Sequence, residues 1–366
     1  MPRMAIVAGL HLRWDGVRQR PHHILSRLAE RVPVVVIEEP FVIEEEERDE
    51  LLHDGGVTIV RPLRKPLQDG PYVDPHAVET ARGLIGDARA LVWLYQPLML
   101  ALADAFEGPL VYDCMDDLAT FAFAPPQLRA CERMLLERAE RVFCGGRTLF
   151  ETRRRYGEKV RLVPSGVEFE RFAAARKLAP HPAVAALPRP RWGYVGVIDE
   201  RLDYMLLDAL ADAEENPQIV MIGPVAKIDA RLLPRRANVH FTGKQPYASL
   251  PSMLAGLDAG LMPFARNDST RAISPTKTLE YLAAGLPVVT TPIADVVADY
   301  GDVVIVAEGS RFVRACAGLA DGRAFPASAS AGAERAKRSA RGIELAREHS
   351  WDSIVHRMWS EVEELL

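Results

Sequence analysis

Residues 274–292, SPTKTLEYLAAGLPVVTTP, combine a polar turn, a short helix and a buried strand. The turn SPTK (274–277) opens the helix, and the free backbone N–H groups and positive dipole of a helix start suit an anion. Gly285 ends the helix, and the apolar run VVTT (288–291) predicts a strand inside a sheet. Glu280 adds a carboxylate one helical turn beyond the polar turn. The stretch therefore predicts a helix, tight turn and strand that present an anion site and a carboxylate together.

The composition fits a globular protein of two domains. The chain has 366 residues, of which 48% are hydrophobic, and this length allows two domains of about 150 to 200 residues with separate cores. A formal net charge of -5 argues against a general nucleic-acid binder, which usually carries a basic excess. The four cysteines lack C-x-x-C spacing and suit a reducing compartment as buried free thiols.

No stretch of the sequence predicts a secretion signal or a membrane span. The apolar residues 4–9 are too short for the core of a signal peptide, and a polar stretch follows them at once. The most apolar stretch, residues 91–106, is interrupted by Gln96 and Pro97 and is shorter than the ~20 residues of a membrane span. We therefore expect a cytoplasmic protein.

Apolar, β-branched runs alternate with amphipathic stretches along most of the chain. Near-continuous apolar strands separated by helices indicate parallel sheets covered on both faces, which is an α/β fold. Between residues 172 and 191 the composition changes to Ala, Pro, Arg and His, and we interpret residues 176–189 as a linker between two domains. The predicted strands are residues 5–8, 34–37, 91–94, 110–112 and 141–144 in the first domain and 192–196, 219–223, 239–243, 259–262, 288–290 and 303–306 in the second.

The segment 274–292 resembles the C-terminal donor motif of GT-B glycosyltransferases, particularly bacterial polysaccharide transferases of retaining family 4, also described as glycosyl transferases group 1. Ser274-Pro275, the helix start and LPVV (286–289) carry the resemblance by their order and spacing. It implies two Rossmann-like domains that face a central cleft. These are an N-terminal acceptor domain (1–175), a C-terminal donor domain (190–349) and a last helix (350–366) that returns to the N-terminal domain.

On this resemblance the helix that follows Ser274 binds the nucleotide. Glu280 would accept hydrogen bonds from the ribose hydroxyls, and Lys277 would hold the diphosphate together with the backbone of Thr276 and Thr278. A lysine at a helix start is physically suited to phosphate. The alternative is that Lys277 and Glu280, three residues apart, form only a surface salt bridge.

The resemblance is incomplete at Ala272. Many retaining members carry a further glutamate eight positions before the one that matches Glu280, and it usually helps to position the sugar, whereas this chain has alanine there. Some bacterial polysaccharide transferases look like this sequence, with Pro-x-Lys before Glu-Tyr-Leu-Ala. The sequence therefore predicts nucleotide binding without identifying the sugar.

Two further loops of the second domain are candidates for the donor site. The run WGYVGVIDER (192–201) resembles the first strand and glycine turn of the donor domain, where Gly196 permits close approach to a ligand and Arg201 would neutralise the departing diphosphate. Thr242 and Gly243, after another predicted strand, resemble the loop that frames the base. The alternative is that the glycine only permits tight packing and that Arg201 is solvated.

In the first domain, the loop WDGVRQRPHH (14–23) follows the first predicted strand. Ligands of doubly wound folds bind at the carboxyl ends of strands, so we expect this loop to face the cleft. Its W-D-G-x-x-Q-R-P pattern resembles the same bacterial transferases, which implies a donor contact at Gly16. For His22, helix capping or packing is the alternative role. The candidates for acceptor or cleft contacts are Trp14, Arg18, Arg20 and His22.

The acidic run YDCMDD (112–117) ends another strand of the first domain. Carboxylates at a strand end are costly unless they are solvated, paired or used. We interpret Asp113, Asp116 or Asp117 as the residue that orients the acceptor hydroxyl or the donor sugar, and helix capping by Asp116 or Asp117 is the alternative. The D-x-D pattern of metal-dependent glycosyltransferases is absent from the sequence, so neither a metal nor another cofactor is expected.

Residues 129–155 contain eight arginines and four glutamates. Such a patch can contact anionic lipid headgroups beneath a lipid-linked acceptor, and a solvated basic helix face is the alternative. We therefore expect any contact with the inner membrane to be peripheral.

These features together predict a hexosyltransferase. The resemblance implies transfer from a UDP- or GDP-sugar to a hydroxyl of a glycan or lipid-linked acceptor, with retention and without metal, in bacterial envelope or exopolysaccharide synthesis. No nucleic-acid partner is expected. Lys277, Arg201 and backbone amides would stabilise the departing diphosphate. Two alternatives are a GT-B sugar-nucleotide epimerase and a non-catalytic module that binds nucleotide sugars.

Overall fold

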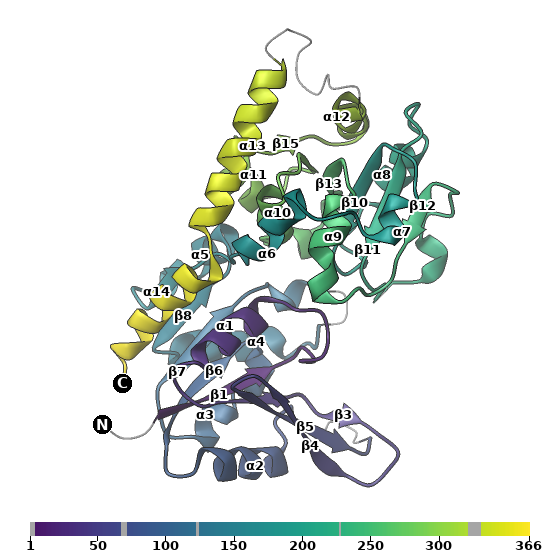
Figure 1. Ribbon diagram of the computed structural model, residues 1–366. Coiled ribbons are helices and arrows are strands. Elements are labelled where there is room, and N and C mark those ends of the chain that lie inside the picture. The colour runs from purple at the N-terminus through teal and green to yellow at the C-terminus, as the bar shows by residue number, and fades with distance from the viewer. Residues whose placement is uncertain (1–3, 67–71, 122–123, 227, 321–330) are drawn as a thin grey trace. The chain divides into compact units, whose positions relative to one another are not determined.

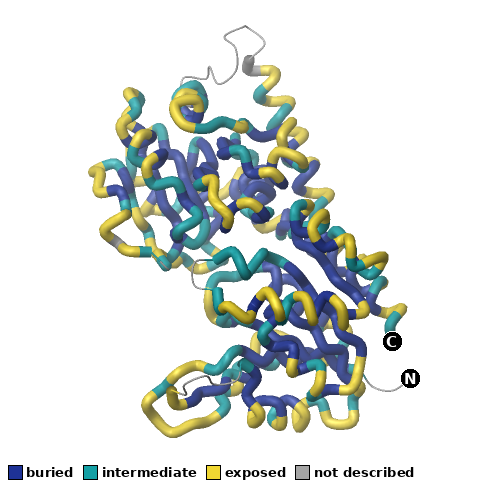
Figure 2. Tube along the Cα trace, turned by 180° about the vertical axis from the view of Figure 1, so that it is seen from behind, coloured by how far each residue is buried: buried dark blue, intermediate teal, exposed yellow. Residues whose placement is uncertain are grey.

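The computed structural model describes residues 4–66, 72–121, 124–226, 228–320 and 331–366. The chain divides into two compact units: unit 1 comprises Met1–Pro164 and Trp351–Leu366, and unit 2 comprises Ser165–Ser350. Each unit is built on its own mainly parallel sheet (Figure 1). The strands of both sheets are largely buried, and the more exposed residues lie on the surrounding helices and loops (Figure 2).

Within the described residues, unit 1 forms a nine-stranded sheet in the order β3-β5-β2-β1-β6-β7-β8-β9, with β4 pairing antiparallel to β5. The central strand β1 is parallel to both neighbours, with Val7 opposite Val35 of β2 and Val92 of β6. Both faces of these strands are covered, which explains their unbroken apolar sequence. The strands are β1 Met4–Leu10, β2 Val34–Glu38, β3 Phe41–Val42, β4 Arg48–Asp54, β5 Val57–Arg64, β6 Arg89–Leu94, β7 Leu110–Cys114, β8 Arg141–Cys144 and β9 Val160–Leu162.

The helices of unit 1 include the C-terminal helix α14. One core of the unit joins its residues Trp351 and Met358 to Ile24 of α1 and to Ile6 of β1. The Trp351 ring stacks on His23 with 4.9 Å between ring centroids. The last helix thus packs in unit 1. The helices are α1 Arg20–Leu28, α2 Pro75–Ile85, α3 Leu102–Ala105, α4 Leu128–Arg138, α5 Arg147–Arg153 and α14 Trp351–Glu363, with 3₁₀ turns η1 Pro97–Met99, η2 Leu118–Thr120 and η3 Arg154–Tyr156.

Unit 2 contains a fully parallel sheet, which has six strands in the part of the chain that is described, in the order β12-β11-β10-β13-β14-β15. All six strands predicted for the second domain are present. They are β10 Arg191–Val195, β11 Gln218–Ile222, β12 Val239–Phe241, β13 Ala259–Met262, β14 Val288–Thr290 and β15 Ile305–Val306. The helices are α6 Phe169–Ala173, α7 Pro182–Ala185, α8 Tyr204–Ala211, α9 Leu250–Ala255, α10 Lys277–Ala283, α11 Ala294–Tyr300, α12 Ser310–Ala320 and α13 Ala331–Glu348, with 3₁₀ turns η4 Ala174–Arg176, η5 Ala230–Leu232, η6 Tyr247–Ser249 and η7 Asp268–Thr270.

The boundary between the units differs from the predicted linker at residues 176–189. The chain passes from unit 1 to unit 2 after Pro164, and the predicted linker lies inside unit 2. Phe172 is fully buried and meets the Tyr247 ring edge to face, and Val184 is also fully buried. Val184, which lies between Pro182 and Pro188, therefore packs the predicted linker into the core of unit 2, although the composition looks like that of a linker.

We predict that Trp351→Ala lowers the free energy of unfolding by about 3 to 5 kcal/mol, because it removes a large side chain from the core that joins α14 to unit 1. Urea denaturation followed by circular dichroism would measure the change. His356→Ala, at an exposed position of the same helix, is the matched control and should change the free energy by less than about 0.5 kcal/mol. Equal effects of the two variants would show that α14 contributes little to the core.

Candidate functional site

The predicted donor residues of unit 2 gather at one edge of its sheet. Gly196 follows β10, Thr242 follows β12, and the turn at residues 274–277 lies between β13 and β14, where it opens α10. Because the strands are parallel, their carboxyl ends meet at this edge, which is where doubly wound folds bind ligands.

Three glycines bring the backbones of neighbouring loops into contact at this edge. Gly196, Gly223 and Gly243 have φ angles of 155°, 146° and 69°. A Cβ atom on Gly223 would lie 1.9 Å from the carbonyl oxygen of Gly196, and Gly223 forms an isolated bridge with Gly243. Only glycine fits at position 223. Gly223 is not among the predicted site residues, although the strand endings YVG, MIG and FTG share one pattern.

Thr242 and Arg201 are both held by neighbouring groups. The Thr242 N–H donates to the carbonyl of Met221 at 3.0 Å. The Arg201 guanidinium forms a bidentate ion pair with Asp199. Its Nε donates to Oδ1 at 2.9 Å and its Nη2 donates to Oδ2 at 2.6 Å. Asp199 is buried, and the arginine side chain is about a quarter exposed (23%). Arg201 is therefore an oriented cation rather than a freely solvated one.

Lys277 and Glu280 form an ion pair at the start of α10. The Lys277 Nζ lies 2.9 Å from Oε1 and 3.1 Å from Oε2 of Glu280. Their side chains are only 16% and 6% exposed. The pair is thus present, but it is mostly buried and is not the surface salt bridge of the alternative interpretation. It places a desolvated carboxylate and an ammonium group together.

The electrostatics of Glu280 are dominated by its burial. Burial raises the pKa of the Glu280 carboxyl, the nearby Lys277 ammonium lowers it, and the carboxylate of Glu168 raises it further. Burial also raises the pKa of Tyr247, with smaller contributions in the same direction from the carboxylates of Glu280 and Glu168. Glu168 precedes α6, so no local pattern in the sequence connects it with Glu280, and it is not among the predicted site residues.

The other predicted residues of this segment lie at different depths. Ser274 and Thr276 are half-buried. Thr278 is fully buried, its hydroxyl donates to the Met262 sulfur at 3.3 Å, and its N–H donates to the carbonyl of Pro275. Its side chain therefore anchors α10 to the sheet. Ala272 is buried as well.

In unit 1, the loop that contains Trp14 is fixed by a buried carboxylate. The Trp14 N–H donates to Glu38 Oε1 at 2.7 Å, and Arg61 Nε donates to Glu38 Oε2 at 2.7 Å. Glu38 is fully buried at the end of β2, and it is not among the residues predicted from the sequence. Trp14 is itself buried, and its indole N–H donates to Asp54 at 3.0 Å.

Gly16 and Arg18 lie in the same loop. The Gly16 N–H donates to the carbonyl of Arg13 at 2.9 Å, and a Cβ atom at position 16 would lie 2.8 Å from that oxygen. Gly16 thus permits a tight turn. The Arg18 side chain is about a quarter exposed and lies 4.0 Å from the Asp54 carboxylate.

Arg20 and Asp113 form an ion pair inside unit 1. Arg20 Nε lies 2.9 Å from Asp113 Oδ1, and Arg20 Nη1 donates to the carbonyl of Val163 at 2.8 Å. The two charged side chains are 2% and 0% exposed. Burial raises the pKa of the Asp113 carboxyl. The positive charge of Arg20 acts in the opposite direction but does not cancel this effect. The pair joins the first loop to β7 within the core, so a ligand could not reach Asp113 without displacement of neighbouring groups.

The geometry of His22 fits the capping alternative. His22 Nδ1 accepts the N–H of Gln19 at 3.0 Å, and Nε2 lies 3.0 Å from the carbonyl oxygen of Trp14. Burial lowers the pKa of His22. The imidazole therefore bridges the start of α1 to the preceding loop.

Asp116 and Asp117 follow β7 and are more accessible than Asp113. The Asp117 carboxylate does not cap η2; it lies 3.4 Å from Arg153 Nη2, which also donates to Glu132 at 2.8 Å. Arg153 and Glu132 are mostly buried. Arg153 thus belongs to a network that holds the loop after β7 and does not contribute to a solvated basic face.

The predicted basic patch at residues 129–155 is smaller than its arginine count suggests. Arg141 and Arg153 are buried, and Arg141 pairs with Glu361 and Glu364 of the C-terminal segment. The remaining arginines of the stretch are exposed, namely Arg129, Arg133, Arg138, Arg147, Arg154 and Arg155.

Comparisons with known proteins agree with this architecture. Residues 189–321 match the family model described as Glycosyl transferases group 1. Sucrose-phosphate synthase from Thermosynechococcus elongatus superposes with a TM-score of 0.74 at 16% identity and covers 99% of each chain. Anabaena HepE in complex with UDP-glucose superposes with a TM-score of 0.70 at 12% identity and covers 99% of this chain and 100% of its own.

The chain has the GT-B fold, and residues 189–321 of its second unit are similar to the glycosyl transferases group 1 family. A relative in sequence is the "Putative teichuronic acid biosynthesis glycosyltransferase TuaH" of Bacillus subtilis, which is 26% identical over 60% of this chain. The match spans 59% of that relative's length, which is less than two thirds.

This GT-B chain shows neither a metal cluster nor a membrane helix in the part that the structure describes. No group of three or more His, Cys, Asp or Glu side chains among the described residues is placed to hold a metal ion. No described helix is both long and apolar enough to cross a membrane.

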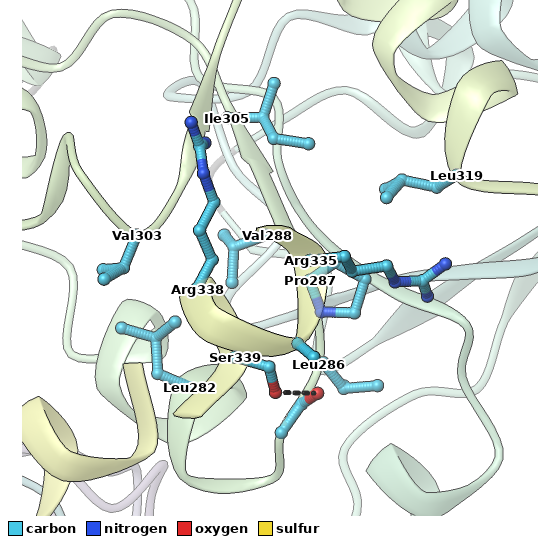
Figure 3. Close-up of a pocket in the computed structure, with 12 residues that line it drawn as sticks. Leu282, Leu286, Pro287, Val288, Val303, Ile305, Leu319, Arg335, Arg338 and Ser339 are labelled. Atoms are coloured by element: carbon cyan, nitrogen blue, oxygen red, sulfur yellow. Dashed lines mark hydrogen bonds between the residues drawn. The ribbon is translucent and has the colours of Figure 1, made fainter. Parts of the chain in front are cut away.

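A pocket of about 290 Å³ lies in unit 2, and Figure 3 shows the side chains that line it. It is at the opposite edge of the sheet from the first residues of α10. Its wall includes Leu286, Pro287 and Val288, which enter β14, and Leu282 of α10. Arg335 and Arg338 of α13 line it as well. The amino ends of parallel strands lie at this edge, so the pocket is separate from the predicted donor site.

We predict that Arg153→Met lowers the free energy of unfolding by about 3 to 5 kcal/mol, because the mostly buried Glu132 carboxylate would lose its ion partner. Urea denaturation would measure the change. Arg154→Met removes the next arginine, whose side chain is 65% exposed, and should cost less than about 0.5 kcal/mol. A similar cost for both variants would contradict a special role for the Arg153 network.

We predict a pH-dependent effect of Glu280→Gln on stability. Because the Glu280 pKa is raised above its usual value of 4.5, the folded protein binds more protons than the unfolded chain just above pH 4.5, and the wild type loses stability as pH rises through the folded pKa. Glutamine does not titrate. The free energy of unfolding of the variant, minus that of the wild type, should therefore increase as pH rises from about 4.5. A constant or falling difference in urea denaturation would contradict the prediction.

Proposed function

We propose that this chain is a glycosyltransferase that transfers a hexose from a nucleoside-diphosphate sugar to an acceptor hydroxyl. The observation that carries the proposal is the buried Lys277–Glu280 pair at the carboxyl edge of a group 1 domain. A cation beside a carboxylate matches the two chemical groups of a ribose diphosphate, since phosphate needs positive charge and hydroxyls need acceptors. HepE has been solved with UDP and UDP-glucose, which supports UDP as the nucleotide, with GDP as the other option.

The proposed roles in unit 2 follow from charge and position. Glu280 would accept hydrogen bonds from the ribose hydroxyls, and Lys277 would then turn from Glu280 toward the diphosphate. Arg201, held by Asp199, would add a second positive charge at the same edge. Thr242, Gly243 and the turn at Ser274 would frame the base and the phosphates with their backbone groups. Such preorganised charge is the largest expected contribution to catalysis of diphosphate departure.

The proposed chemistry is substitution with retention at the anomeric carbon. The bond from that carbon to the diphosphate oxygen breaks, and a bond to the acceptor oxygen forms on the same face of the sugar. The acceptor proton moves to the departing phosphate oxygen, so no separate base is required. Asp116 or Asp117 would orient the acceptor hydroxyl, and no metal ion takes part in the proposal.

The proposed setting is bacterial polysaccharide synthesis in the cytoplasm. The name of the sequence relative, a teichuronic acid biosynthesis glycosyltransferase, supports an envelope or exopolysaccharide acceptor, either a glycan or a lipid-linked one. The exposed arginines of residues 129–155 would provide peripheral contact with anionic lipid.

A binding screen tests the donor half of this proposal. Purified protein would be titrated by calorimetry with UDP, GDP and dTDP and with their common sugar conjugates, with and without EDTA. Selective binding of one nucleoside diphosphate, unchanged by EDTA, is the expected result. Binding of none would overturn the proposal, and nucleotide release that does not depend on an acceptor would favour an epimerase.

We predict different effects for Glu280→Gln and Asp116→Asn. Glu280→Gln should weaken binding of the nucleoside diphosphate by about tenfold or more, because hydrogen bonds to a charged acceptor are lost. Asp116→Asn should leave this affinity within about twofold and reduce the rate of transfer. Calorimetry and a transfer assay on the same preparations would measure both effects. An equal loss of nucleotide affinity in the two variants would contradict the division of roles.

A further inference from the structure

A second pocket of unit 2, of about 350 Å³, lies at the same edge of the sheet as Lys277 and Glu280. It is lined by residues 266–268, Thr270 and Arg271, which follow β13, and by residues 292–294, which follow β14. Both segments leave the carboxyl ends of parallel strands, where doubly wound folds bind ligands. The volume is in the range of small-molecule sites.

The loop that forms one wall of this pocket is preorganised. Asn267 Oδ1 accepts the N–H of Thr270 at 3.1 Å and the hydroxyl of Ser269 at 2.7 Å. The Thr270 hydroxyl donates to the carbonyl of Ala265 at 2.5 Å. Ser269 and Thr270 are both buried. These hydrogen bonds fix the backbone that carries Arg266 and Arg271.

The residues that line the pocket include one more cationic than anionic side chain. Two arginines and one aspartate, Asp268, line it. Arg266 pairs with Glu308 at 3.2 Å, and that glutamate is outside the lining. Neither Arg271 nor Asp268 has a side-chain hydrogen bond or ion pair among the residues that the structure describes. Arg271 therefore presents a planar, permanently charged donor group to the pocket, and no carboxylate of the described residues is hydrogen-bonded to it.

We propose that Arg271 and Arg266 bind the carboxylate of an acidic donor sugar, so that the preferred donor is a nucleoside-diphosphate hexuronate. This inference rests on the proposed function. Guanidinium groups recognise carboxylates through paired N–H donors, which a neutral hydroxymethyl group cannot match. Lys277 follows Arg271 by six positions in the chain, so one short segment supplies cations for both the diphosphate and the sugar carboxylate. A donor diphosphate has similar anionic chemistry, and the test must distinguish these two sources.

The test compares UDP, UDP-glucose and UDP-glucuronate by calorimetry, or GDP, GDP-mannose and GDP-mannuronate if the protein selects guanine. The wild type should bind the uronate conjugate at least about tenfold more tightly than the neutral conjugate. Arg271→Gln should abolish this preference and leave the affinity for the plain diphosphate within about twofold, and Arg266→Gln should reduce the preference. Arg231→Gln, an exposed arginine of the same unit that pairs with Asp229, is the matched control and should change neither affinity.

The outcomes separate this inference from the proposed function. If the protein binds the plain diphosphate but shows no preference for the uronate, the inference is wrong and the proposed function stands. If Arg271→Gln weakens the plain diphosphate as much as the uronate conjugate, the pocket binds phosphate and the inference is again wrong. Absence of any nucleotide binding would overturn both.

Discussion

The position of α10 depends on the buried phenol of Tyr281. The Val195 N–H at the end of β10 donates to the Tyr281 Oη at 2.7 Å, and the ring lies so close to β13 that a Cβ atom on Gly260 would be 2.6 Å from it. Burial raises the pKa of Tyr281 far above its usual value, so the phenol stays protonated. One side chain thus fixes the helix that carries Lys277 and Glu280 against the two strands beside it.

The charged groups of this edge are arranged at a cost to the fold. Glu280 keeps a raised pKa although Lys277 lies 2.9 Å away, which means that loss of hydration outweighs the attraction of the ammonium. Isolated buried ion pairs seldom stabilise a protein relative to apolar residues of the same size. A ligand that donates hydrogen bonds to the carboxylate and presents an anion to the lysine would satisfy both groups. The free-energy cost of burying these two charged groups in the ligand-free protein would then be reduced in the complex, which favours binding.

The sequence predicted the strands, helices and turns that depend on residues close together in the chain. The two sheets followed from apolar runs, because parallel strands are buried on both faces, and residues 274–292 formed the expected helix, turn and strand. The unit boundary was missed because the segment around Pro182 has a linker's composition, while a single apolar residue, Val184, holds it in a core. Glu38 and Glu168 were missed for a related reason, since their partners lie far away in sequence.

The alternation of side chains along β7 explains why its neighbouring aspartates differ. Successive residues of a strand point to opposite faces of a sheet. Asp113 points to the side where Arg20 of α1 meets it, whereas the Tyr112 hydroxyl donates to Glu132 of α4 on the other side. Asp117 lies beyond the strand and is held from that second side by Arg153, which also contacts Glu132. Asp113 is therefore a core residue, while Asp116 and Asp117 lie on a loop that the buried Arg153 contacts. Asp113 is fixed by Arg20 but is fully buried, whereas Asp116 and Asp117 are partly exposed and Asp117 is also held by an arginine. The loop after β7 therefore combines accessibility with a fixed carboxylate, which the proposed role in acceptor orientation requires.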